Sequence, residues 1–226
     1  MMKSFPPLPL IAPSLLSADK CRLEEEVRFA ISNGTRVLHF DVMDGIFVSN
    51  VTFGLPLFKE LRKAFPSLLF DSHLMVKDPK ELASDFAKEG SDVVTVHYEA
   101  FASKEELLDT LRLIRSAGSK AGLSIKPSTE VEVLLPYLSE CDLILIMSVE
   151  PGKGGQPFLP SSLPKLSWLK EKKASLGRND LLVEVDGGIN EKTASLALKS
   201  GAEILVAGSY LFGHPDFGER MEGLLK

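Results

Sequence analysis

Residues 36–45 read RVLHFDVMDG, and this stretch contains the pattern that decides the fold. It is apolar and partly β-branched, which is typical of a strand, and successive side chains of a strand point to opposite faces. His39, Asp41 and Met43 therefore share one face. The opposite face is entirely apolar and consists of Leu38, Phe40 and Val42. An apolar face is expected on the side of a sheet that is covered by helices. We therefore expect the opposite face, with His39 and Asp41, to point into a barrel.

Similar apolar runs recur along the chain and predict eight strands. These lie at residues 8–15, 36–42, 68–74, 92–97, 120–125, 142–147, 181–186 and 203–208, each followed by a stretch of helical periodicity. Gly34, Gly90, Gly118 and Gly201 separate helical stretches from the next strand, where glycine can end a helix in the left-handed conformation. The alternation predicts one (β/α)8 TIM barrel domain over residues 1–226, with a closed parallel sheet.

A doubly wound open sheet is the alternative fold. It would usually carry a glycine-rich phosphate turn after its first strand, whereas residues 14–17 read SLLS here. The sequence pattern therefore favours the closed barrel.

The composition excludes several classes of protein. A net charge of −5 without a basic run argues against nucleic-acid binding. No window reaches the roughly 18 apolar residues of a membrane span. Prolines at positions 6, 7, 9 and 13 would break the apolar helix of a signal peptide. Cys21 and Cys141 form no CxxC pair, so we expect buried free thiols and a cytoplasmic location.

Polar side chains stand at the ends of three predicted strands, where the active sites of barrels lie. These residues are His39, Asp41, His73 and Asp186. Two imidazoles and two carboxylates suit zinc, iron(II), manganese or cobalt better than an all-oxygen calcium site. We predict that these four residues hold one divalent metal ion. The alternative, two core histidines and a turn-capping aspartate, is weaker because four such residues converge.

Two further residues are expected near this site. Asp71 shares the inward face with His73 and is a candidate for orienting a histidine ligand. His97 ends the fourth predicted strand, and we expect it to support the site or to pack beside it, not to bind the metal.

Glycine-rich loops follow the last three predicted strands. Residues 152–156 read GKGGQ, residues 186–188 read DGG and residues 207–209 read AGS. Closely spaced glycines allow backbone N–H groups to converge on an anion, and the final loops of barrels often hold a phosphate. One such loop is commonly only a turn, but three in the second half of the chain predict a phosphate site.

Seven ordered motifs make the chain resemble the ribulose-phosphate 3-epimerase family essentially from end to end. They read APSLLSAD at 12–19, HFDVMDG at 39–45, HLMV at 73–76, MSVEPG at 147–152, GGQ at 154–156, EVDGG at 184–188 and AGS at 207–209. The resemblance implies a TIM barrel enzyme that interconverts D-ribulose 5-phosphate and D-xylulose 5-phosphate, with one divalent ion per subunit. It further implies that Asp41 and Asp186 are the acid/base pair and that Ser14 contacts the substrate.

The expected substrate contacts combine the phosphate loops with the ends of the earlier strands. They are Ser14, His73, Gly152, Lys153, Gly154, Gly155, Asp186, Gly187, Gly188, Gly208 and Ser209. Lys153 departs from the aromatic residue usual in the family at this position, and it can either pair with phosphate or point into solvent. Met43, Met75 and Met147 are expected to line the pocket and keep water out, or else to be ordinary core residues.

The expected reaction begins at C3 of the sugar, whose hydrogen is acidic because it lies next to the C2 ketone. One aspartate removes the proton, which gives an enediolate, and the other returns a proton on the opposite face. The metal is expected to stabilise the negative charge as a Lewis acid. The partner is a small sugar phosphate, and we expect a homo-oligomer that contacts neither membrane nor nucleic acid.

Three alternatives involve other substrates or classes of function. An epimerase of a ketohexose phosphate such as allulose 6-phosphate would keep the same aspartates, but such relatives tend to lose the second glycine of Gly187-Gly188. A Schiff-base aldolase would use Lys126 as its nucleophile. A sugar-phosphate sensor would need no acid/base pair.

Overall fold

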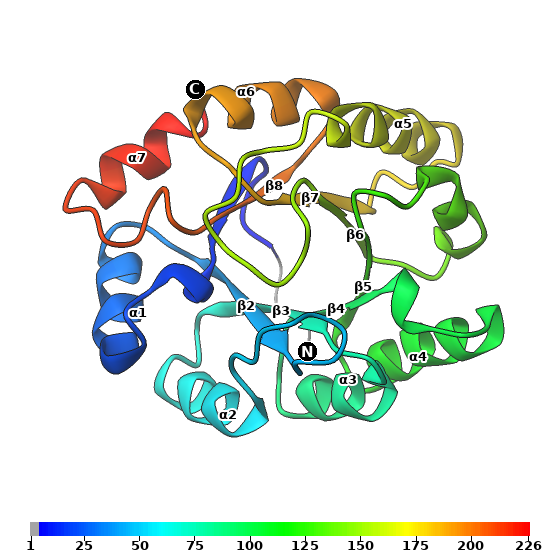
Figure 1. Cartoon of the computed structure of the whole chain (residues 1–226), viewed down its shortest axis with the longest axis horizontal. Helices are drawn as coiled ribbons and strands as arrows, with labels where there is room; N and C mark the ends of the chain where they lie inside the picture. The colour runs from blue at the N-terminus through cyan, green and yellow to red at the C-terminus, as the bar shows by residue number, and fades with distance from the viewer. Residues whose placement is uncertain (1–4) are drawn as a thin grey trace.

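Eight apolar segments form parallel strands that enclose a nearly closed barrel in this computed structural model, which describes residues 5–226 (Figure 1). The strands are β1 (Leu10–Pro13), β2 (Val37–Met43), β3 (Leu69–Met75), β4 (Val93–His97), β5 (Lys120–Ile125), β6 (Leu143–Met147), β7 (Leu182–Asp186) and β8 (Ile204–Ala207). Their order is β1-β8-β7-β6-β5-β4-β3-β2, and an isolated parallel bridge between Ser14 and His39 joins the two ends. The predicted TIM barrel is confirmed.

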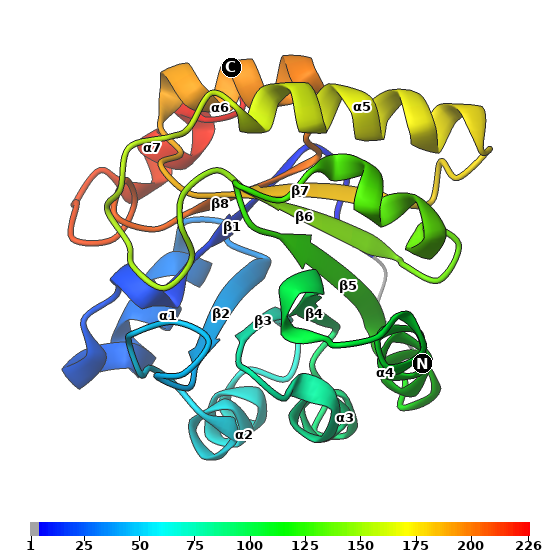
Figure 2. The ribbon, with the colours of Figure 1, turned by 45° about the vertical axis from the view of Figure 1, so that its right-hand side comes forward.

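Helices surround the strands, as Figures 1 and 2 show. They are α1 (Leu23–Ser32), α2 (Leu55–Ala64), α3 (Pro79–Lys88), α4 (Lys104–Ser116), α5 (Ser162–Ser175), α6 (Glu191–Ser200) and α7 (Phe217–Gly223). The short 3-10 helices are η1 (Leu15–Ser17), η2 (Lys20–Arg22), η3 (Tyr98–Ala100) and η4 (Val131–Tyr137). Gly34, Gly90, Gly118 and Gly201 all have positive φ, as expected at helix ends.

The segment after β5 differs from the predicted strand–helix alternation. It forms the 3-10 helix η4 where an α-helix was expected. Pro136 lies inside this helix, and proline removes an N–H donor and crowds the preceding turn. The segment therefore covers β5 without completing an α-helix.

The two faces of β2 lie in different environments, as the alternating pattern predicts. Phe40 packs between strands and helices, where its ring contacts those of Phe53, Phe58 and Phe86. His39 and Asp41 face the barrel interior and are 0% and 2% exposed. The interior therefore contains polar side chains, including Asp71 and Glu184, together with an apolar cluster that includes Val37, Leu69 and Leu143.

The two cysteines lie in different surroundings, and the expected burial of Cys21 is wrong. Cys21 is exposed because it belongs to the surface helix η2. Its N–H donates a hydrogen bond to Oδ1 of Asp19, the N-cap of this helix. Cys141 is buried, and burial raises the pKa of its thiol far above the usual value. Within residues 5–226, no helix combines the length and apolar character needed to cross a membrane.

Thiol labelling tests this difference. A thiolate-specific reagent at neutral pH should modify one cysteine of the native protein, Cys21, and both after denaturation, because burial protects Cys141. A Cys21→Ser variant should remain unlabelled while folded. Rapid labelling of that folded variant would show that Cys141 is accessible.

Candidate active site

Strands β2, β3 and β7 bring four predicted residues together at the carboxyl end of the barrel. His39, Asp41, His73 and Asp186 each place one nitrogen or oxygen atom within 4.8 Å of the others. They are separated by up to 147 positions in the sequence, yet the parallel register places Asp41 directly opposite His73 on the neighbouring strand. The convergence that was expected from strand ends is therefore present.

The spacing of these atoms fits a divalent metal ion. His39 Nε2 lies 3.3 Å from Asp41 Oδ1 and 3.3 Å from His73 Nδ1, and His73 Nδ1 lies 3.1 Å from Asp41 Oδ1. Tetrahedral ligands about 2.0–2.1 Å from a zinc ion would be about 3.3 Å apart. Mixed nitrogen and carboxylate donors also suit iron(II), manganese or cobalt. The cluster could therefore bind a divalent ion.

Asp71 orients the first of the two histidines. Its Oδ2 lies 2.8 Å from His39 Nδ1, so that nitrogen donates a hydrogen bond to the carboxylate. When the imidazole is neutral, His39 Nε2 carries a lone pair and faces Asp41 and His73. This arrangement matches the carboxylate–histidine pairs that support metal ligands elsewhere.

His97 and Glu99 lie behind the second histidine. His73 Nε2 is 2.8 Å from His97 Nε2, and His97 Nδ1 is 3.2 Å from Glu99 Oε2. Burial lowers the pKa of His97 to about 4, so the ring is neutral at pH 7. Burial raises the pKa of Glu99, but its bonds to His97, Thr129 and the Lys126 N–H outweigh this and lower it to about 2.

The two aspartates differ in their affinity for a proton. Burial raises the pKa of Asp41, but His39 and His73 lower it by more, so the pKa lies below its usual value. Burial, and after it the charge of Asp41, raise the pKa of Asp186 to about 6. Ser14 Oγ donates a 2.6 Å hydrogen bond to Asp41 Oδ2, which fixes that carboxylate.

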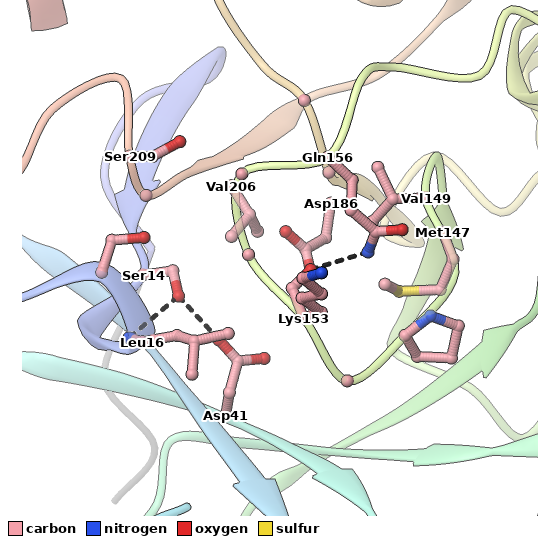
Figure 3. A pocket seen from close by; sticks show the side chains of 18 of the residues that line it. Ser14, Leu16, Asp41, Met147, Val149, Lys153, Gln156, Asp186, Val206 and Ser209 are labelled. Atoms are coloured by element: carbon pink, nitrogen blue, oxygen red, sulfur yellow. Dashed lines mark hydrogen bonds between the residues drawn. The ribbon is translucent and has the colours of Figure 1, made fainter. Parts of the chain in front are cut away.

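A pocket of about 540 Å³, partly open to solvent, lies above the cluster (Figure 3). Figure 3 shows Asp41 and Asp186 approaching it from different sides. All but one of the predicted substrate contacts line it, together with the three methionines, namely Ser14, Gly152, Lys153, Gly154, Gly155, Asp186, Gly187, Gly188, Gly208, Ser209, Met43, Met75 and Met147. The exception is His73, which is 0% exposed and lies beneath the pocket beside His97.

Close contacts between loops shape the rim of this pocket. A Cβ on Gly188 would lie 2.7 Å from Phe158 Cα and closer still to the Phe158 nitrogen, so only glycine fits there. Asn50 Nδ2 donates a 2.7 Å hydrogen bond to the Gly152 carbonyl and ties the β2–α2 loop to the β6–α5 loop. Asn190 caps α6 in a capping box with Thr193.

The two lysines considered from the sequence occupy different places. Lys153 is exposed at the pocket rim, and its ammonium forms no ion pair with any residue in 5–226. Lys126 lies outside the pocket, with its Nζ 4.0 Å from the centre of the Phe47 ring. The position of Lys126 therefore gives no support to a Schiff-base nucleophile.

Several residues near the site were not predicted. Ser17 and Gln156 line the pocket, and Glu99 supports His97. The sequence does place Glu99 two residues after a strand-end histidine, which is a usable signal for a supporting carboxylate. Ser17 lies in η1, where its Oγ approaches Gly208, and only the folded structure reveals this contact.

Comparison with known proteins identifies the family of this chain. The sequence model of the ribulose-phosphate 3 epimerase family matches residues 10–212. The chain belongs to this family. It is 43% identical over 206 residues to ribulose-phosphate 3-epimerase of Bacillus subtilis, covering 91% of this chain and 93% of that protein. It is 45% identical over 208 residues to the enzyme of Mycobacterium tuberculosis, covering 92% and 88%. The protein is thus an isomerase-class enzyme of the ribulose-phosphate 3-epimerase family.

Solved structures show the same fold at low sequence identity. A 3-keto-L-gulonate-6-phosphate decarboxylase from Vibrio cholerae has a TM-score of 0.72 at 14% identity, covering 97% of this chain and 96% of that chain. A 3-hexulose-6-phosphate synthase has a TM-score of 0.66 at 18% identity, covering 95% and 96%. These similarities establish the barrel fold of this epimerase-family chain and nothing about its substrate.

Two glycine substitutions test the packing of the pocket rim. Gly188→Ala should raise KM for a sugar phosphate at least tenfold, because the methyl group would displace the Phe158 backbone. Gly177→Ala is the matched control: its φ of +67° is close to the +63° of Gly188, but nothing lies within 4 Å of its Cβ. Both variants should lose about 1–2 kcal/mol of stability from left-handed strain. Equal KM values for the two variants would contradict the role of this contact.

Proposed function

We propose that the protein is a metal-dependent epimerase that interconverts D-ribulose 5-phosphate and D-xylulose 5-phosphate. Membership of the family supports the reaction. One structural observation carries the proposal: of the four clustered residues, the two aspartates line the pocket while the two histidines lie beneath it. Carboxylates on different sides of a bound sugar are what an inversion at carbon requires.

The aspartates are suited to opposite roles at the start of turnover. The low pKa of Asp41 keeps it ionised, so it begins as the base that removes the C3 proton. The raised pKa of Asp186 makes it the better proton carrier, so it begins as the acid that returns a proton to the other face. Their roles exchange in the reverse reaction. Positioned proton transfer of this kind gives about 10²- to 10⁴-fold acceleration.

Residues His39, Asp41, His73 and Asp186 would hold the divalent ion. When bound, the ion would supply Lewis-acid stabilisation of the negative charge that develops as the substrate becomes an enediolate. The chain's own residues contribute the rest. Ser14 fixes the Asp41 carboxylate, and Met43, Met75 and Met147 provide an apolar wall without exchangeable protons.

The phosphate of the substrate is assigned to the rim formed by Gly155, Gly188 and Gly208. These glycines come from the loops after β6, β7 and β8, and all three line the pocket. Backbone N–H groups at such loops suit an anion. Lys153 is free of other ion pairs within residues 5–226 and can add a positive charge there.

The pentulose phosphate is preferred to allulose 6-phosphate because Gly188 is present and closely packed against Phe158. A sugar-phosphate sensor would need no acid/base pair, whereas the pKa values of Asp41 and Asp186 are shifted in opposite directions, which suits one. We also propose a cytoplasmic protein that forms homo-oligomers. Two free cysteines support the first, and Ile46 and Val51, which are 71% and 74% exposed in the β2–α2 loop, support the second.

A coupled assay of D-ribulose 5-phosphate conversion tests the reaction and its metal requirement together. The protein should lose activity when a chelator removes metal, and zinc, iron(II), manganese or cobalt should restore it. Circular dichroism provides the control that the stripped protein remains folded. Full activity of demonstrably metal-free protein would refute the metal requirement, and inactivity with every metal would refute the substrate.

Removing either carboxylate tests the acid/base pair. Asp41→Asn and Asp186→Asn should each reduce kcat by at least 10³-fold, because an amide can neither accept nor donate the transferred proton. Asp180→Asn, at an exposed position paired with Arg178, is the control and should leave kcat unchanged. Near-normal kcat in a variant that still binds metal would exclude that aspartate as acid or base.

A further inference from the structure

We propose that Glu99 positions the metal ligand His73 through His97, and that Lys165 anchors the loop that holds Glu99. The inference rests on the proposed metal site. It concerns residues outside that site, because Glu99, Lys165 and the intervening loop do not line the pocket. Three sets of hydrogen bonds lead outward from the proposed ligand His73 to Lys165.

The hydrogen bonds determine which nitrogen of His73 and of His97 carries the proton. If His73 Nδ1 binds the metal, it offers a lone pair, and the proton of the ring is on Nε2. That N–H then donates to His97 Nε2 at 2.8 Å. Since His97 Nε2 accepts, its own proton is on Nδ1, which donates to Glu99 Oε2 at 3.2 Å. Each group has only one arrangement that satisfies its neighbour.

The Glu99 carboxylate is itself held by two donors from another loop. Glu99 Oε1 accepts a 2.7 Å hydrogen bond from the Lys126 backbone N–H and another from the Thr129 hydroxyl. These donors belong to the loop after β5, which is closed by a bond from the Thr129 N–H to the Lys126 carbonyl. The Phe47 ring lies against His97, tilted by 44° with ring centroids 4.9 Å apart, and His97 is fully buried.

The loop of residues 126–129 is held in place by Lys165. Lys165 Nζ donates to the carbonyls of Lys126, Pro127 and Thr129, with distances of 3.2, 2.6 and 2.6 Å. Lys165 is 9% exposed, and an ammonium with three carbonyl partners satisfies all three of its donors. Lys165 lies in the first turns of α5, directly after the loop that lines the pocket.

This arrangement makes Glu99 a positioning residue. The Glu99 carboxylate at the end of this series of hydrogen bonds favours a proton on His97 Nδ1 and on His73 Nε2. The lone pair of His73 Nδ1 is then a better donor to a cation. The arrangement also fixes the ring planes, because each imidazole is held at both nitrogens. Loss of such an outer partner typically costs about 10- to 100-fold in metal affinity.

Metal binding by the full-length chain provides the test. Cobalt(II) would be titrated into stripped wild-type protein and into Glu99→Gln, following the visible absorption of the bound ion and competition with a chelator. We expect cobalt affinity to fall about 10- to 100-fold in Glu99→Gln. Glu105→Gln, an exposed glutamate at the start of α4, is the control and should bind as wild type.

A double variant separates positioning from general stability. Because Glu99 acts through His97, Glu99→Gln should weaken cobalt binding no further in a His97→Gln background. Lys165→Met should weaken binding in the same direction as Glu99→Gln, whereas Lys170→Met on the exposed face of α5 should not. The unfolding temperature of each metal-free variant identifies any that fail to fold, and the Glu99 variants suffice if Lys165→Met is one of these.

The outcomes distinguish this inference from the function on which it rests. Wild-type cobalt affinity in Glu99→Gln, with normal binding by the wild-type chain, would overturn the positioning role and leave the metal site standing. Additive losses in Glu99→Gln and His97→Gln would overturn the proposed route through His97. Failure of the wild-type chain to bind cobalt, zinc or manganese would overturn both proposals.

Discussion

Mutual compensation of buried polar groups is the constraint on which this candidate active site depends. Asp41, His39 and His73 are almost completely removed from water inside the barrel, where an isolated charge would be strongly destabilising. Each is therefore held by a neighbour: Asp41 by Ser14, which directly follows β1, His39 by Asp71 on β3, and His73 by His97 on β4. These partners also dictate which atom of each side chain faces the cluster. The same hydrogen bonds that stabilise Asp41, His39 and His73 in the interior thus orient them for binding a cation.

The same constraint accounts for the contrast between the two aspartates. Asp41 lies against two imidazoles, whereas Asp186 ends β7 at the edge of the pocket and faces the charge of Asp41. Pairs of titratable groups whose surroundings separate their pKa values are well suited to acid/base chemistry. Here the separation follows from strand register, which places Asp41 opposite His73 and Asp186 opposite Met147.

Much of this architecture could be predicted from the sequence because strand periodicity is local. The alternation in residues 36–45 placed His39 and Asp41 inside and Phe40 outside, and the structure agrees. Features that depend on distant packing could not be predicted. Pro136 changed the expected helix after β5, Cys21 is exposed on η2, and the contacts of Lys165 join segments nearly forty residues apart. The enclosure of His73 beneath the pocket likewise follows from His97, on a different strand.

The junction between the first and second strands links the closure of the sheet to the candidate site. Among residues 5–226, β1 forms its ladder with β8, while its link to β2 is the isolated bridge between Ser14 and His39. The same Ser14 hydroxyl reaches across this seam to Asp41. The sheet is therefore joined edge to edge at residues of the candidate site. Ser14 takes part both in closing the sheet and in holding Asp41 in place, so this seam of the fold and the candidate site depend on the same residue.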